Sequence, residues 1–264
     1  MKKPLWFFPL ALVAAALAGF LFPARDPGLT ITIIYDNYPA DPACRADWGF
    51  SCFVEGFEKA ILFDAGTEEE TFLNNVGALK IDLSRIGLAV LSHFHGDHTG
   101  GLEASFRKRP GLTLYVPVDH AALFSPRWEK AGGKVVPVAQ PLELCEGVWV
   151  TGTMGEAVKE QALILETREG LVIIAGCAHP GIAGMVEKAR QATGRPIAAV
   201  LGGFHLLQTD NADIGRIIAR FKELGVARVG ASHCTGDKAI ALFRKAYQDR
   251  FVELGAGRVV RFEK

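Results

Sequence analysis

The sequence has no excess charge of either sign: its 29 lysines and arginines balance 29 aspartates and glutamates over 264 residues. It also has no internal repeat and no low-complexity tract. Without a strongly basic surface, nucleic-acid binding is not indicated, and we expect a small-molecule substrate instead. Hydrophobic residues make up 49% of the chain, which excludes a largely disordered protein. The length allows a sizeable hydrophobic core.

Cysteine is sparse, with five residues and no C-x-x-C pair, and this argues against a thiol redox enzyme. Cys44 and Cys52 are candidates for a disulfide if the protein is exported, although Cys52 suits a buried free thiol equally well. Cys177 and Cys234 each lie close to a histidine in the sequence. No cysteine follows the N-terminal apolar run, so a lipoprotein anchor is not indicated.

The N-terminus has the layout of an export signal, because Lys2 and Lys3 precede an uncharged apolar run from 4 to 23. Ala16-Leu17-Ala18 offers a cleavage site with two small residues, but about 20 apolar residues also suffice to span a bilayer. A cleaved signal and an uncleaved membrane anchor both stay open, with the anchor slightly favoured. The lysines predict an extracytoplasmic location for the rest of the chain. The predicted division is a signal peptide or transmembrane anchor at 1–24, a linker at 25–28 and one domain at 29–264.

Beyond residue 28, short apolar strands alternate with helical segments, which predicts an α/β fold. The principal strands are expected at 29–35, 50–55, 60–63, 112–116, 162–166, 171–175, 197–201, 226–231, 251–254 and 258–262. The principal helices are expected at 68–76, 98–106, 182–193, 210–224 and 238–247. Thr67 is expected to cap the first of these helices.

Four metal-ligand residues fall within six positions, directly after an apolar run that reads as a buried strand. They are His93, His95, Asp97 and His98. His93 and His95 are two residues apart, so in an extended backbone they point the same way and can share one ion. The turn at Gly96 directs Asp97 and His98 towards a second ion. This H-x-H-x-D-H pattern predicts a metal site.

Other ligand-capable residues recur where apolar strands end: Asp64, Cys177, His179, His205 and His233. Functional sites in layered α/β folds are commonly built at such strand ends. His120 has no ligand neighbour in the sequence, and we interpret it as an ordinary surface residue.

These residues predict a centre with two ions, one held by His93, His95 and His179 and the other by Asp97, His98 and His233. Three protein ligands per ion leave a position open, which is the arrangement of catalytic zinc sites. Nitrogen and oxygen ligands favour Zn²⁺, with Mn²⁺ or Fe²⁺ as alternatives.

The hexapeptide at 93–98 resembles the signature of the metallo-β-lactamase superfamily. Together with FDAG at 63–66, GCAHPGI at 176–182, GGFHL at 202–206 and SHCTG at 232–236, it resembles the branch of dihydropterin–ribofuranosylaminobenzene phosphate synthase-like hydrolases. The resemblance implies a four-layer αββα sandwich with the metals in a groove at one edge of two sheets. It also implies that Asp64 supports the metal site from behind.

The chain departs from the superfamily pattern at the bridging aspartate, which is missing from the strand that ends at Cys177. Cys177 is therefore the candidate for that ligand position. The resemblance then offers Glu156 or nothing for the usual third histidine, with His179 or His205 in its place. The G-H-T-P-G motif of glyoxalase-type and lactonase enzymes is absent, which disfavours those activities.

The chemistry that these residues predict is metal-dependent hydrolysis of an ester, lactone, amide or phosphoester by a metal-bound hydroxide. Asp97 is expected to orient the water and take its proton, and His205 to protonate the leaving group. One alternative is a pterin-type synthase, in which the ions assist a pyrophosphate leaving group. Another is a metal-binding sensor module without turnover.

Overall fold

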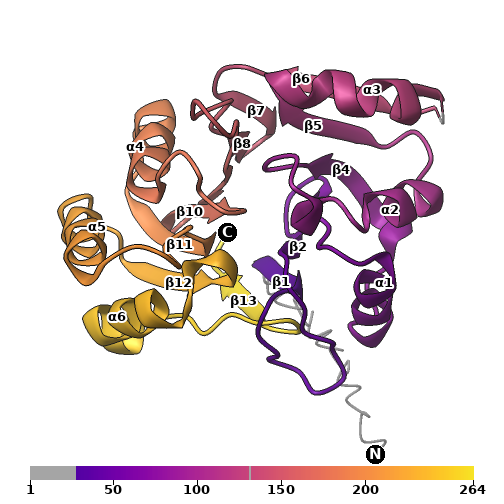
Figure 1. Ribbon diagram of the computed structural model, residues 1–264. Coiled ribbons are helices and arrows are strands. Elements are labelled where there is room, and N and C mark those ends of the chain that lie inside the picture. Colours follow the sequence, from indigo (N-terminus) through magenta and orange to yellow (C-terminus); the bar gives the residue numbers. More distant parts are fainter. Residues whose placement is uncertain (1–27, 131) are drawn as a thin grey trace, which may run out of the picture.

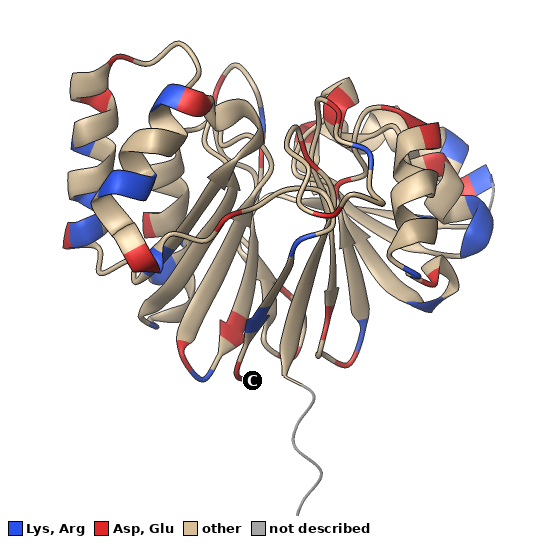
Figure 2. Ribbon diagram, turned by 90° about the horizontal axis from the view of Figure 1, so that it is seen from below, with Lys and Arg blue, Asp and Glu red and all other residues tan. Residues whose placement is uncertain are grey.

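Two β-sheets face each other, and helices cover the outer face of each sheet (Figure 1, Figure 2). The structure is a computed structural model that describes residues 28–130 and 132–264. The predicted four-layer αββα sandwich is confirmed. The predicted N-terminal segment 1–24 lies outside the described residues. Within the described part, no helix is both long enough and apolar enough to cross a membrane.

The first sheet has seven strands in the order β13-β1-β2-β3-β4-β5-β6. Their bounds are β1 Leu29–Tyr35, β2 Ser51–Glu55, β3 Ala60–Phe63, β4 Ile86–Val90, β5 Thr113–Pro117, β6 Lys134–Val138 and β13 Val259–Phe262. Strands β3 to β6 run parallel, whereas β13, β1, β2 and β3 pair antiparallel. The covering helices are α1 Glu69–Ala78, α2 Leu102–Lys108 and α3 Ala121–Lys130.

The second sheet has six strands in the order β12-β11-β10-β9-β8-β7. Their bounds are β7 Leu142–Cys145, β8 Val148–Val150, β9 Leu163–Thr167, β10 Gly170–Ala175, β11 Ile197–Gly203 and β12 Arg228–Ser232. Strands β10, β11 and β12 run parallel to one another. The covering helices are α4 Ile182–Thr193, α5 Asn211–Glu223 and α6 Asp237–Tyr247.

Three hydrophobic clusters correspond to the three interfaces between the four layers. The central cluster joins the inner faces of the sheets through residues such as Phe63, Val90 and Ile174. Each outer cluster packs one set of helices on its sheet, with Phe72 of α1 on one side and Phe243 of α6 on the other. Because β10 and β11 are covered on both faces, they read as continuous apolar runs rather than alternating ones.

The parallel strands of both sheets end at the same edge of the sandwich. Short 3₁₀ helices follow three of them: η2 Gly96–His98 after β4, η3 Val118–His120 after β5 and η4 His233–Thr235 after β12. Loops at the carboxyl ends of parallel strands are the usual location of binding sites in open α/β sheets. This edge carries the histidine-rich segments of the sequence.

Several local predictions were wrong. The helix expected at 98–106 is broken, because η2 ends at His98 and α2 begins only at Leu102. The strand expected at 251–254 is reduced to a single bridge between Phe251 and Val229. Thr67 does not cap α1, since its hydroxyl donates to the carbonyl of Trp48 instead.

No disulfide joins Cys44 and Cys52, and all five cysteines are free. Cys52 lies on β2 within the core between the sheets, whereas Cys44 lies in the loop after β1 beside Gly257. The two side chains belong to different environments, which explains why the possible pairing is not made.

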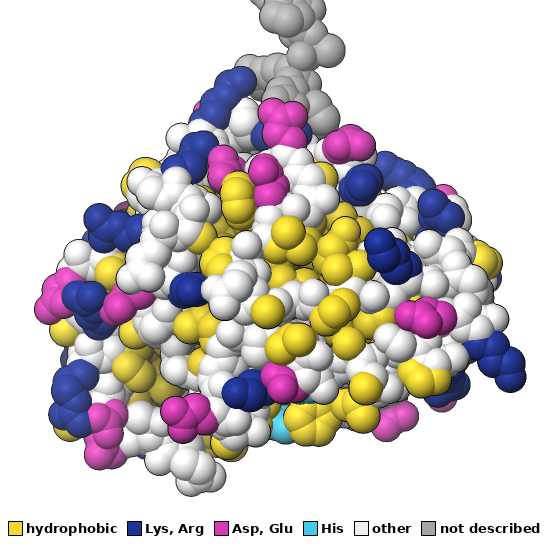
Figure 3. Space-filling model, turned by 90° about the horizontal axis from the view of Figure 1, so that it is seen from above, with side chains coloured by type: hydrophobic (Ala, Val, Ile, Leu, Met, Phe, Trp, Pro, Cys, Tyr) yellow, Lys and Arg dark blue, Asp and Glu magenta, His cyan; other side chains and the backbone are white. Residues whose placement is uncertain are grey.

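Charged residues of both signs are interspersed on the outer helices (Figure 2). On the face seen in Figure 3, which includes the edge strands β6 and β7, hydrophobic side chains gather in the middle and charged ones lie mostly around them. Leu142 of β7 is among the exposed apolar residues of the molecule. The polar, ligand-rich edge of the sandwich is therefore distinct from this apolar face.

Candidate metal centre

The sequence-predicted residues converge at the carboxyl edge of both sheets. Asp64 follows β3, His93 is the third residue after β4, Cys177 follows β10, His205 follows β11 and His233 follows β12. Asp64, His205 and His233 have positive φ angles of 55°, 53° and 49°. Such angles are uncommon for residues other than glycine, and they cluster where a fold holds functional side chains against their local preference.

The first group of potential ligands consists of His93, His95 and His179. One ligand atom from each lies within 4.8 Å of the others. Nε2 of His93 is 3.1 Å from Nδ1 of His95, and the rings of both stand 4.8 Å from the ring of His179 between centroids. The structure thus brings together the three residues that the sequence assigned to one ion.

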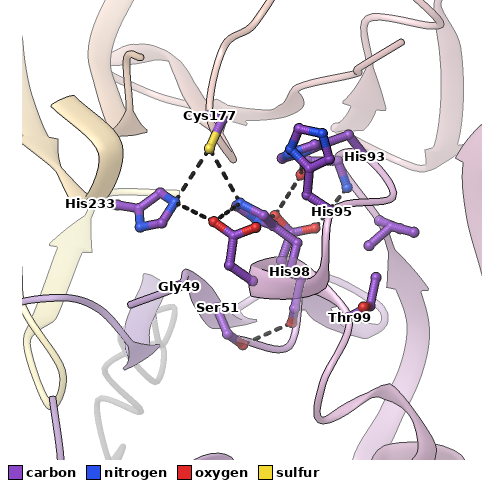
Figure 4. Close-up of polar contacts among 12 residues, drawn as sticks. Gly49, Ser51, His93, His95, His98, Thr99, Cys177 and His233 are labelled. Carbon is purple, nitrogen blue, oxygen red and sulfur yellow. Dashed lines mark hydrogen bonds and ion pairs between the residues drawn. The ribbon is translucent and has the colours of Figure 1, made fainter. Parts of the chain in front are cut away.

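The second group consists of Asp97, His98, Cys177 and His233. The sulfur of Cys177 is 3.3 Å from Nε2 of His98 and 3.3 Å from Nε2 of His233 (Figure 4). An Asp97 oxygen lies 3.6 Å and 3.4 Å from the same two nitrogens. The group therefore contains the predicted triad, and Cys177 completes it from the β10 end.

A buried carboxylate positions two histidines of the first sheet through their Nδ1 atoms. Asp64 accepts a hydrogen bond from Nδ1 of His98 at 2.7 Å and two more from the backbone and hydroxyl of Ser92. Because the Ser92 hydroxyl donates to Asp64, its oxygen accepts from Nδ1 of His93 at 2.9 Å. These contacts place the protons on Nδ1, so the Nε2 lone pairs of both histidines face the centre. Asp64 has the supporting geometry that the resemblance implied.

The loop between β1 and β2 holds the other side of the second group. Asn37 accepts from Nδ1 of His233 at 2.9 Å and from the Gly49 amide at 3.0 Å. The indole N–H of Trp48 donates to Asp97 at 2.9 Å. A loop from the first sheet therefore fixes a histidine of the second sheet.

Sequence reasoning missed Glu160, the buried carboxylate of the second half. It accepts from the backbone amides of Cys177, Ala178 and His179 at 2.8 to 2.9 Å. It thereby fixes a loop in which Ala178 has a φ of 60°. Since the donors are backbone groups, no side-chain pattern announces the contact, and Glu156, which the resemblance offered, is exposed instead.

Glycines near the strand ends allow neighbouring segments of backbone to approach closely. A Cβ on Gly176 would lie 2.2 Å from the Ser92 hydroxyl and 2.8 Å from an Asp64 oxygen, so only glycine lets β10 reach the first sheet here. Gly100 likewise packs against the backbone of Thr67.

Burial and charge set the protonation of the ring nitrogens. Burial, with His98 and His179 close by, holds the pKa of His93 well below its usual value. Burial, with His205 and His95, lowers the pKa of His179 to about 4. These rings are thus neutral at pH 7 and offer lone pairs, as metal ligands must. Burial alone would lower the pKa of His98 as well, but the Asp64 carboxylate outweighs it and raises that pKa.

The carboxylate of Asp97 is kept ionised. Burial acts to raise the pKa of Asp97, but the contact with His233 and the proximity of His98 outweigh burial and lower that pKa. An ionised carboxylate between two imidazoles suits either a cation or a proton in transit.

His205, predicted as a catalytic residue, lies outside both groups at the exposed rim. Its ring centroid is 4.2 Å from that of His179. It forms a further cluster with Cys177 and Cys234, whose ligand atoms all lie within 4.8 Å of one another. Cys234 is buried beside the Cys177 carbonyl, at 3.6 Å from sulfur to oxygen.

His120, interpreted from the sequence as a surface residue, is buried with a 5% exposed fraction. It follows β5, and its ring packs 4.9 Å from that of Phe94, which also stands 5.0 Å from His95. The burial depends on Phe94 folding over it from the neighbouring strand end, which the local sequence does not reveal.

The residues present fit a metal centre. Nε2 of His179 is buried and has no hydrogen-bond partner among the described residues, which is costly unless another species fills that position. The two groups combine neutral imidazoles, a carboxylate and a thiol, and these donors suit zinc.

The family model of the metallo-β-lactamase superfamily matches residues 49–190. With the fold and the histidine-rich centre, this match shows that the chain belongs to the metallo-β-lactamase superfamily, as its motifs predicted. Metal binding and a metal-dependent enzymatic role are the properties that this membership supports.

Among individual relatives, the chain is similar to the 7,8-dihydropterin-6-methyl-4-(β-D-ribofuranosyl)-aminobenzene-5′-phosphate synthase of Methanocaldococcus jannaschii. The two are 31% identical over 265 residues, covering 81% of this chain and 90% of the relative. A crystal structure described as a metal-dependent hydrolase of the β-lactamase superfamily has a TM-score of 0.75 and 25% identity, covering 89% of this chain and all of the other. The metallo-β-lactamase fold protein YhfI from Bacillus subtilis has a TM-score of 0.63 at 15% identity, covering 88% of this chain and 98% of YhfI.

Proposed function

We propose that this protein is a hydrolase with two zinc ions that acts on an ester, lactone, amide or phosphoester. The observation that carries the proposal is the pair of adjacent ligand groups, His93–His95–His179 and Asp97–His98–Cys177–His233. The outward nitrogens of His93, His98 and His233 are occupied by hydrogen bonds, which leaves Nε2 of each free to bind. Bound zinc supplies Lewis acidity that polarises a carbonyl or phosphoryl oxygen and acidifies water.

Asp97 is the residue that we propose to handle the proton of the attacking water. Its side chain retains 17% exposure, so substrate and solvent can reach it, while the Trp48 indole fixes one oxygen. His205 stands at the rim beside His179, where it can donate a proton to a leaving group that departs towards solvent. Asp97 thus orients the nucleophile, and His205 completes bond cleavage.

The test is hydrolysis of generic aryl esters and phosphodiesters by the zinc-loaded protein, before and after chelation. We expect activity to disappear with the metal and to fall about 10²–10⁴-fold in Asp97→Asn, since a positioned base contributes that much. Asp249→Asn, an exposed aspartate in the 3₁₀ helix η5 Gln248–Arg250, is the matched control and should be unchanged. Full activity after chelation would contradict the proposal.

The Methanocaldococcus jannaschii relative favours a second candidate, a pterin-type synthase that forms a bond by displacing pyrophosphate. The same ligand groups would serve it, and the supporting observation is the 31% identity over most of both chains. Reaction in ¹⁸O-enriched water separates the two candidates. A hydrolase places one solvent oxygen in its products, whereas condensation places none.

The export signal or anchor at 1–24 and the extracytoplasmic location stay predictions, supported by Lys2, Lys3 and the apolar run behind them. An extracytoplasmic location disfavours the synthase, because pterin substrates are intracellular. Fractionation of cells that express the full chain would test it: recovery in the cytosol would remove this argument against the synthase.

A further inference from the structure

A small pocket opens beside the second ligand group. It has a volume of about 150 Å³ and is lined by Trp48, His205, Leu207, Gln208 and Cys234. The pocket adjoins the candidate metal centre, because Trp48 donates to Asp97 at 2.9 Å and its ring lies 5.2 Å from that of His233. A substrate group bound here would therefore lie next to the reacting bond.

Two walls of this pocket are apolar and exposed. Six large hydrophobic side chains are exposed in the described part of the chain, and Trp48 and Leu207, at 47% and 52%, both line this one pocket. Phe94, also exposed, borders the first ligand group beside His95. A single exposed apolar residue is ordinary, but several around one polar centre mark a surface that a ligand covers.

Leu207 is held in place by its surroundings. A Cβ on Gly236 would lie 2.6 Å from the Leu207 side chain and 3.1 Å from its Cα, so the leucine packs directly on a glycine backbone. Trp48 is held by its bond to Asp97. The two walls are thus preformed, and ordering them does not reduce the affinity for a ligand.

The lining of the pocket contains no lysine or arginine. The lysines on two segments near the centre are engaged elsewhere: Lys159 donates to the Gly155 carbonyl at 2.8 Å and Lys238 to the Thr209 carbonyl at 2.6 Å. Among the lining residues only His205 can pair with a phosphate or carboxylate group, and it is the residue that we propose to protonate the leaving group. The group that fits is uncharged, and a cavity of about 150 Å³ is the size that accommodates benzene.

We propose that this pocket binds one uncharged ring of phenyl size, which defines the substrates as esters, lactones or amides with a compact apolar substituent beside the cleaved bond. This inference rests on the proposed hydrolase and narrows its substrate class, since phosphoesters with anionic flanking groups are disfavoured. Trp48 and Leu207 are its specificity-determining residues.

The test compares acetohydroxamate with phenylacetohydroxamate as ligands of the zinc-loaded protein, by isothermal titration calorimetry. Both probes bring the same metal-binding group, and only the second brings a ring. We expect the ring to tighten binding at least about 10-fold, because it covers apolar surface. Leu207→Ala should remove most of that gain. Leu142→Ala, at another exposed leucine on β7, is the control and should keep that gain.

Equal affinity for the two probes, or a ring preference that survives in Leu207→Ala, would overturn the inference. The outcome is separable from that of the proposed function, because binding is measured without turnover. A ring preference without metal-dependent hydrolysis of either the esters or the phosphodiesters would refute the hydrolase and leave the pocket standing. Hydrolysis without a ring preference would refute the pocket and leave the hydrolase standing.

Discussion

The two halves of the candidate centre are constructed differently. The first sheet supplies His93, His95, Asp97 and His98 from one short segment after β4. The second sheet supplies Cys177, His179 and His233 from the ends of β10 and β12, far apart in the chain. Each half depends on one fully buried carboxylate, Asp64 in the first and Glu160 in the second.

The difference lies in what each carboxylate holds. Besides the Ser92 amide, Asp64 binds two side chains, the imidazole of His98 and the hydroxyl of Ser92, so two of its three partners must be particular residue types. Glu160 binds three backbone amides, which every residue except proline offers. One half is therefore specified by a pattern of residue types and the other by the path of the chain.

The largest expected effect is a loss of folding stability in Asp64→Ala, which removes the carboxylate of the first half. His98 and Ser92 would lose a buried anionic acceptor, and breaking such a buried pair costs about 3–5 kcal/mol. Urea unfolding of the metal-free protein measures this free energy. Asp249→Ala, exposed on η5, should stay within about 0.5 kcal/mol of wild type. An Asp64→Ala protein as stable as that control would show that the first half does not depend on Asp64.

A smaller loss of folding stability is expected for Glu160→Gln in the second half. The amide can still accept from two backbone N–H groups through its oxygen, but its NH₂ group would face the His179 amide. One buried donor left unpaired costs about 1–3 kcal/mol. Glu156→Gln, on the same loop but exposed, is the matched control. Equal stability of the two variants would show that Glu160 does not stabilise the second half.

The smallest effect is expected for Asn37→Ala, a change in zinc affinity that tests the contact between the two halves. This change frees Nδ1 of His233, and loss of such a supporting hydrogen bond typically weakens metal binding about 10–100-fold. Competition with a chromophoric chelator measures the zinc affinity. Asn37→Asp, which keeps an acceptor for Nδ1 of His233, should restore most of the lost affinity. Unchanged affinity in Asn37→Ala would mean that the loop after β1 does not position His233.

The same contrast explains what the sequence could and could not predict. The hexapeptide and the histidines at strand ends were predictable, because strand periodicity and ligand type are local properties. Glu160 was not, because its partners lie 17 to 19 residues away and are backbone groups. His120 was misread for a related reason, since Phe94 from the neighbouring strand end buries it. Tertiary contacts decided both cases.

The glycine contacts also escaped prediction. Gly202 and Gly203 let β11 approach β10, and Gly176 lets the end of β10 approach the first sheet, so closely that a Cβ would lie 2.1 to 2.2 Å from neighbouring atoms. Their role is visible only when the two halves of the centre are seen to meet at Gly176.

We propose that the two adjacent ligand groups each hold one ion, and counting the bound metal tests this proposal. Inductively coupled plasma mass spectrometry of the zinc-dialysed protein should find two ions per chain in wild type. It should find one in His179→Ala, which breaks the first group, and one in His233→Ala, which breaks the second. Two ions retained in both variants, or only one in the wild-type protein, would contradict the account.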